Sequence, residues 1–263
     1  MQRLLLIVIS FIAISSNAIV AQDKVLTLNE KIAINNLKDH VMSERKETVA
    51  NQIKYPLDRC DYFEYNINDK NDFINSFDKI FDSKQIEEFQ VSKWEYVYYP
   101  MFEYYSLQGE GYIGEFDDSG KMKLTHIPLS ESETIYIQGL IDSEKKSLHP
   151  SLRNYVEPIC LLFAGKYRIR IDLMHDGNIR YSSWKKDAAT SAIPDLVIYG
   201  GKRWGNRWGT NYDFKNGEYE YHIEDYFVGE GPYFNVSENG KIIMEISSDN
   251  IQIKRFSRSW SIL

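Results

Sequence analysis

The tripeptide Arg-Trp-Gly occurs twice within residues 200–209, with its two copies four residues apart. Tryptophan and arginine are the side chains that most often anchor interfaces. A flat indole can stack on a sugar ring, and a guanidinium pairs with a carboxylate or phosphate through two hydrogen bonds. We therefore predict a flexible, glycine-containing binding loop for an unknown protein or an acidic glycan, with four contact residues: Arg203, Trp204, Arg207 and Trp208. The alternative is a long hairpin whose indoles fold back on the sheet.

The other polar residues form no familiar catalytic or cofactor motif. The five histidines lack the spacing of a zinc site, and neither a G-x-S-x-G elbow nor a P-loop is present. Gly109–Gly114 fits G-x-G-x-x-G by letter, but the following residues predict a strand where a dinucleotide site needs a helix. We predict no cofactor and no metal. Carboxylates are plentiful, and a hydrolase would need two of them facing each other across a cleft; the candidates are Glu110, Glu115, Glu218, Glu220 and Glu224.

The chain contains two cysteines, Cys60 and Cys160, in apolar segments. In an oxidising compartment they could form a disulfide. They could equally be two buried thiols, each packing as a small apolar side chain. The sequence leaves both interpretations open, because the spacing of two cysteines does not report the geometry that a disulfide needs.

The first 21 residues have the pattern of a secretory signal peptide. Arg3 precedes an apolar run over residues 4–14, and small residues follow, including Ala18 and Ala21. An N-terminal membrane anchor is the alternative, but the run is short for a span. We predict export to the periplasm or the outside of the cell, with no transmembrane segment in the mature chain.

The mature chain is acidic. Arg3 is the one charged residue in the leader, so 30 basic residues oppose 38 acidic ones and the net charge is −8. Non-specific nucleic-acid binding needs a basic surface that releases phosphate counterions. The composition therefore argues against a nucleic-acid partner.

The elements of the first half can be predicted from caps and apolar spacing. Thr27 and Glu30 form a capping box that begins a first long helix, with an apolar stripe that continues to Ile53. Pro56 ends that helix, and a strand rich in aromatic residues follows over residues 57–67. Asn68 or Asp69 caps the next helix, whose buried side chains are Phe73, Phe77, Ile80 and Phe81.

Three short stretches within this order of elements resemble the NTF2-like fold of small secreted bacterial proteins: Tyr55-Pro56-Leu57, Asp72-Phe73-Ile74 and Phe77-Asp78-Lys79-Ile80-Phe81. The resemblance covers about residues 27–127. It implies helices packed on a curved sheet, and homodimerisation by analogy of fold. It implies no function, because this fold serves enzymes, binding modules and scaffolds alike.

The predicted fold class is α+β with two domains. Residues 22–127 form the NTF2-like domain, residues 128–152 are a polar linker with a crossing strand at Thr134–Leu140, and residues 153–263 form an antiparallel β domain. Alternating apolar residues and tight turns at Asp176-Gly177, Asn216-Gly217 and Asn239-Gly240 predict a β-sandwich or a small barrel in that domain.

Three functions fit these features. We favour a non-enzymatic binding protein that uses the Arg-Trp segment. The first alternative is an exported immunity or inhibitor protein that blocks another protein's active site, for which the acidic charge would complement a basic toxin. The second is a carboxylate-dependent hydrolase in the first domain, which would need an open aromatic cone rather than one filled by Trp94, Tyr96, Tyr98 and Phe102.

Overall fold

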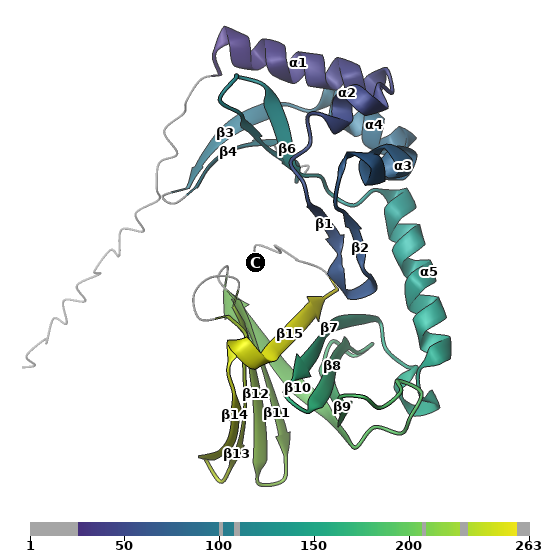
Figure 1. Ribbon diagram of the computed structural model, residues 1–263, viewed down its shortest axis with the longest axis vertical. Coiled ribbons are helices and arrows are strands. Elements are labelled where there is room, and N and C mark those ends of the chain that lie inside the picture. The colour runs from purple at the N-terminus through teal and green to yellow at the C-terminus, as the bar shows by residue number, and fades with distance from the viewer. Residues whose placement is uncertain (1–25, 100–101, 108–110, 207–208, 227–230, 257–263) are drawn as a thin grey trace, which may run out of the picture.

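The computed structural model describes residues 26–99, 102–107, 111–206, 209–226 and 231–256. The predicted signal peptide, Arg207 and Trp208 lie outside these residues. The chain forms a helical lobe with a small sheet and a second lobe built on one large sheet, and helix α5 runs between them (Figure 1). The predicted mixture of helices and strands is confirmed. No helix in the described part of the chain is long and apolar enough to cross a bilayer.

The first lobe packs helices on a four-stranded antiparallel meander of order β3-β4-β5-β6. A separate two-stranded sheet, β1-β2, points toward the second lobe (Figure 1). The elements in chain order are α1 (Leu28–Met42), α2 (Lys46–Ala50), β1 (Leu57–Cys60), the 3-10 helix η1 (Asp61–Phe63), β2 (Tyr65–Ile67), α3 (Lys70–Ile80), α4 (Ser83–Val91), β3 (Trp94–Tyr99), β4 (Phe102–Leu107), β5 (Ile113–Phe116) and β6 (Met122–His126).

The predicted helix caps of this lobe are confirmed. Thr27 and Glu30 form a capping box on α1, and Asp69 accepts hydrogen bonds from the first turn of α3. The apolar face of α3, with Phe73, Phe77 and Ile80, is fully buried in the core of the first lobe. The first helix is shorter than predicted, because Glu44 adopts a left-handed conformation (φ 49°) that separates α1 from α2. The NTF2-like assignment is not confirmed by these elements and stays a prediction.

The predicted crossing strand at Thr134–Leu140 is wrong. These residues belong to α5 (Glu131–Ser147), a 17-residue helix followed by the 3-10 helix η2 (Pro150–Leu152). The β-branched residues of this segment suggested a strand. Two features decide for the helix: a capping box of Ser130 and Glu133, and the burial of Ile137 and Ile141 one turn apart.

The second lobe is a nine-stranded antiparallel sheet of order β14-β13-β12-β11-β10-β9-β8-β7-β15, curled into a nearly closed barrel. This bears out the coarse prediction of an antiparallel β-sandwich or small barrel. The strands are β7 (Glu157–Ala164), β8 (Tyr167–Leu173), β9 (Ile179–Lys185), β10 (Leu196–Asn206), β11 (Gly209–Asn216), β12 (Tyr219–Tyr226), β13 (Tyr233–Glu238), β14 (Lys241–Ile246) and β15 (Ile251–Arg255).

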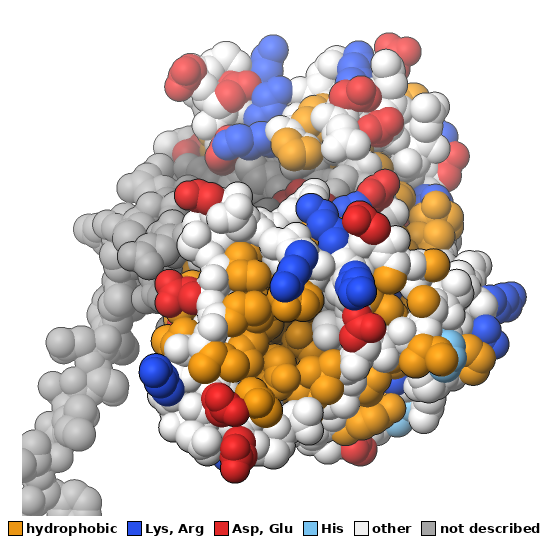
Figure 2. Space-filling view, turned by 60° about the horizontal axis from the view of Figure 1, so that its bottom comes forward, with side chains coloured by type: hydrophobic (Ala, Val, Ile, Leu, Met, Phe, Trp, Pro, Cys, Tyr) orange, Lys and Arg blue, Asp and Glu red, His pale blue; other side chains and the backbone are white. Residues whose placement is uncertain are grey.

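The two faces of the large sheet have different neighbours. The inner face is an apolar core that includes Ile169, Ile171, Phe214 and Phe234. The outer face of β8 and β9 packs against Tyr62 of η1 and against α5 and η2, forming a second cluster that holds the lobes together. At the free underside of the second lobe, apolar side chains line a hollowed area (Figure 2).

Candidate functional site

The described part of the predicted binding loop is a strand rather than a loop. Residues 200–206 belong to β10, which continues as a regular hairpin with β11 through pairs such as Arg203 with Tyr212 and Trp204 with Asn211. Because successive side chains of a strand point to opposite faces, Arg203 and Trp204 cannot form one contact surface. The charge of the Arg203 guanidinium interacts electrostatically with Glu157, Cys160 and Tyr212, which places this group on the side of the inner face.

The Trp204 side chain lies on the outer face of the sheet and is 55% exposed. Its indole Nε1 donates a hydrogen bond to Asp213 Oδ2 at 2.5 Å, from the neighbouring strand β11. This bond holds the edge of the indole ring. The long hairpin of the alternative interpretation is therefore present in β10 and β11, and the Trp204 indole lies on the outer face of this sheet, bonded to the neighbouring strand.

A chain of hydrogen bonds continues across the outer face from Trp204. His222 on β12 contacts Asp213 Oδ1 through Nδ1 at 2.5 Å and Glu224 Oε1 through Nε2 at 3.0 Å. All these side chains are partly exposed: 42% for Asp213, 24% for His222 and 32% for Glu224. We call Trp204, Asp213, His222 and Glu224 the outer-face cluster. Within the described part of the chain, no group of three His, Cys, Asp or Glu side chains is placed to hold a metal ion.

The alternation along β12 was a signal for this cluster, since it places Glu220, His222 and Glu224 on one face. The link to Trp204 could not be predicted, because it depends on the register between β10, β11 and β12. The structure places His222 between two carboxylates.

The environment of His222 favours its charged form. Burial by itself would lower its pKa, but the hydrogen bonds to Asp213 and Glu224 raise the pKa above the ordinary value of 6.5. Because the folded pKa exceeds that of the unfolded chain, the stabilisation from His222 is complete below about pH 6.5 and is lost as the pH rises through the folded pKa.

An NMR titration tests this arrangement. We expect the imidazole of His222 to titrate above pH 6.5, and we expect D213N to lower its pKa because that change removes one partner carboxylate. The H222Q variant should lose more stability relative to wild type at pH 6 than at pH 9. A His222 that titrates at or below pH 6.5 in the wild type would contradict the hydrogen-bond chain.

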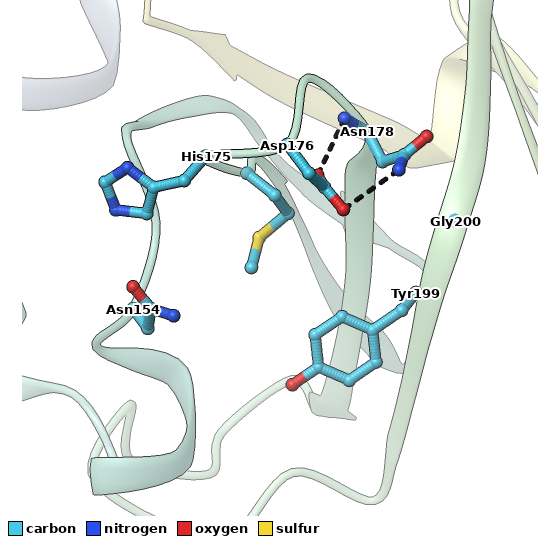
Figure 3. A pocket seen from close by; sticks show the side chains of 7 residues that line it. Asn154, His175, Asp176, Asn178, Tyr199 and Gly200 are labelled. Carbon is cyan, nitrogen blue, oxygen red and sulfur yellow. Dashed lines mark hydrogen bonds between the residues drawn. The ribbon is translucent and has the colours of Figure 1, made fainter.

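A small hollow of about 230 Å³ adjoins the same strand, at the beginning of the β10 bulge. Figure 3 shows the Tyr199 ring of β10 facing Asn154 and the turn that carries His175. The Asp176 carboxylate does not face the imidazole, because it accepts two hydrogen bonds from Asn178, each at 3.0 Å. The turn predicted at Asp176-Gly177 is therefore present, and the Asp176 carboxylate stabilises it.

Tyr199 and Trp204 lie on the same outer face of β10. The strand is bulged between Ile198 and Gly201, and Gly200 within the bulge has φ 74°. A Cβ on Gly201 would lie 2.2 Å from the Phe214 ring, so Gly201 points to the inner core. Because side chains alternate along a strand, Lys202 and Trp204 lie on the opposite, outer face and are exposed to solvent. Tyr199, before the bulge, is exposed on the same face. The outer face of β10 thus presents two exposed aromatic rings with a lysine between them.

The aromatic cone proposed for a hydrolase receives no support from the described residues. Trp94 is 7% exposed and packs edge-on against Phe89 in the first-lobe core. The side chains of Tyr96, Tyr98, Phe102 and Glu110 lie outside the described ones. Glu115 pairs with Lys54 at the surface, at 2.7 Å.

The two cysteines are unbonded and buried. Cys60 lies in the cluster between the lobes, where its thiol contacts the Phe256 carbonyl oxygen at 3.0 Å, whereas Cys160 faces the inner core of the sheet. The thiols therefore lie on opposite sides of the sheet, which is why they form no disulfide. Burial raises the pKa of Cys60 to about 11 and that of Cys160 well above its usual value.

Both thiols should be unreactive in the native protein, because a thiolate is the reacting species and burial disfavours it. With a thiol-reactive chromogenic disulfide at pH 8, we expect no rapid reaction before unfolding and two thiols per chain in denaturant. C60A and C160A should each reduce the denatured count to one. A denatured count of zero in protein purified without reductant would show that the two cysteines are bonded after all.

Comparison with protein-family models, with curated proteins and with solved structures gives no match for this chain.

Proposed function

We propose that this protein is an exported, non-enzymatic binding protein that recognises a carbohydrate through the outer face of β10, β11 and β12. The observation that carries the proposal is the exposed Trp204 indole, whose edge is held by Asp213 while much of the ring stays open to solvent. The export follows from the predicted leader at residues 1–21.

The chemistry of the outer-face cluster suits a sugar. The C–H face of a sugar ring packs on an exposed indole, and its hydroxyl groups donate hydrogen bonds to nearby carboxylates such as Asp213 and Glu224. Both carboxylates remain partly exposed after their contacts with His222, so they keep accepting capacity. A side chain fixed before binding also loses little conformational entropy when the ligand arrives.

The geometry favours a neutral glycan over the acidic glycan expected from the sequence. The expected cation, Arg203, points away from Trp204, and the groups bonded around the indole include two carboxylates. Lys202 is the basic neighbour on the outer face of β10, while Lys215 on β11 already pairs with Glu220 at 3.1 Å. An anionic glycan bound here would be repelled by the nearby carboxylates of Asp213 and Glu224.

The test is affinity electrophoresis of the mature protein in gels containing neutral or acidic polysaccharides, followed by calorimetry on any that retards it. We expect retardation by a neutral polysaccharide, and a loss of affinity of about tenfold or more in W204A. The matched control is Y219A, which removes another exposed ring, 39% exposed, at the far end of β12. It should bind as wild type does.

Each other outcome overturns the proposal in a distinct way. Equal binding by wild type and W204A would move the site away from the outer-face cluster. Salt-sensitive retardation by acidic polysaccharides alone would favour the acidic glycan predicted from the sequence over a neutral one. If no polysaccharide binds, and a protein from envelope extract is retained by the wild type but not by W204A, the inhibitor hypothesis is favoured.

A further inference from the structure

Three buried or partly buried arginines in the described part of the chain share one pattern. The Nε and Nη2 atoms of a guanidinium form an edge that can donate two parallel hydrogen bonds to one carboxylate. In Arg59 this edge binds Glu133, in Arg180 it binds Asp172, and in the partly buried Arg255 it binds Asp225. Each of these cations thus meets an anion at the same two nitrogens.

Arg168 on β8 departs from this pattern. Its side chain is 8% exposed, yet its buried Nε and Nη2 atoms have no hydrogen-bond partner among the described residues. The guanidinium carbon lies 5.0 Å from the ring centroid of Trp184. This cation–π contact stabilises the positive charge, but it leaves the Nε and Nη2 donors without a hydrogen-bond acceptor among the described residues. An unsatisfied buried donor costs about 1–3 kcal/mol, and more when it is charged.

Next to Arg168 on β8 and β9, two further buried polar atoms also have no hydrogen-bond partner among the described residues. They are Oγ of Ser182 and Nη2 of Arg170, and Ser182 sits directly opposite Arg170 across β8 and β9. Arg168 is two residues from Arg170 on β8, so its side chain shares their face. The Tyr62 ring contacts the Arg170 guanidinium, and Tyr62 also interacts electrostatically with Arg168. Both guanidinium groups therefore lie near one phenol. These unsatisfied groups therefore occupy neighbouring positions on one buried face of β8 and β9.

The charges of this buried cluster do not balance. Arg170 binds Asp172 and Glu144, at 2.6 Å and 2.7 Å, and Arg180 binds the same Asp172 at 2.6 Å. Adding Arg168 gives three cations against two carboxylates. A buried charge without a partner is strongly unfavourable. Burial accordingly lowers the pKa of Arg168.

We propose that this spot is a binding site for a small monovalent anion, a halide or a small carboxylate, held by Nε and Nη2 of Arg168 with the Ser182 hydroxyl and Arg170 Nη2. The anion supplies the missing negative charge and the missing acceptor. Because Tyr62 and Glu144 of the first lobe and α5 bond to Arg170 at this place, the bound anion also stabilises the contact between the lobes.

The test measures thermal unfolding of the mature protein in sodium chloride, bromide, acetate and gluconate at one fixed ionic strength. Gluconate is too large for the site and serves as the reference. At a tenfold excess over Kd, we expect Tm to rise by about 3–6 °C in at least one of the small anions. The R168M variant should lose that rise. R45M, which removes an exposed arginine at the start of α2, should keep it.

The salt series also identifies the anion class, since the halides and acetate are separate arms. A crystal soaked in bromide should show an anomalous peak beside Arg168 and Ser182. If R168M does not fold, S182A provides the second variant. In S182A we expect the rise in Tm to need a higher anion concentration for half of its maximum. Equal Tm values in all four salts, an unchanged rise in S182A and R168M, or bromide bound only elsewhere would each overturn the site and leave ordered water as its occupant.

Discussion

The D172N variant is expected to lose about 3–5 kcal/mol of stability, the cost of leaving buried charges without their partner. Asp172 is fully buried and bridges two arginines, with Oδ1 accepting from Arg170 Nε at 2.6 Å and Oδ2 from Arg180 Nη2 at 2.6 Å. Asparagine keeps the size but removes the charge, and its NH2 group would face a guanidinium. Both arginines would then remain at most 2% exposed without this carboxylate.

Urea unfolding followed by tryptophan fluorescence, to which Trp184 of the same cluster contributes, measures this loss. The matched control is E220Q, which breaks the exposed pair with Lys215, whose side chains are 53% and 69% exposed. A surface change of this kind should stay within about 0.5 kcal/mol of wild type. Similar midpoints for D172N and E220Q would show that water reaches the Asp172 cluster.

The R59M variant should be destabilised by a similar amount, about 3–5 kcal/mol, because it strands the buried carboxylate of Glu133. Arg59 on β1 binds both Glu133 oxygens, with Nε to Oε1 at 2.8 Å, and also donates to the carbonyl oxygens of Ile127 and Pro128. The side chains of the pair are 1% and 0% exposed. Arg59 therefore ties β1 to the beginning of α5.

A double-mutant cycle separates the ion pair from the packing of the arginine stem. E133Q retains the capping box of α5, because glutamine can also accept from the Ser130 amide. If the pair interacts as described, R59M/E133Q should lose at least about 1 kcal/mol less than the sum of the single variants. Losses that simply add would show that the Arg59–Glu133 pair contributes little to either change.

The two clusters explain how a connector that reads as a polar linker becomes part of the fold. Glu133 and Glu144 are acidic residues of α5, and a sequence pattern places such residues in solvent. In the structure Glu133 meets Arg59, and Glu144 meets Arg170, Tyr62 and Tyr155. The linker interpretation of residues 128–152 missed both contacts, since the partners lie 11 to 82 residues away.

The sequence by itself determined the features that depend on near neighbours in the chain. Caps at Thr27 and Asp69, the apolar face of α3 and the alternation of β8 and β12 follow from local hydrogen bonding and from the periods of helix and strand. The antiparallel character of the second half followed from its turns. These features need no knowledge of distant residues.

Only the tertiary structure decided which faces meet. Arg203 and Trp204 belong to strand β10, where Arg203 lies on the inner face and Trp204 on the outer face. The register between the strands links Trp204 to Asp213, and Asp213 to His222, by hydrogen bonds. The tertiary structure also placed Cys60 and Cys160 on opposite sides of one sheet. The physical reason is the same in each case: a shift of one residue in register reverses every side chain, and register is set by packing across the whole sheet.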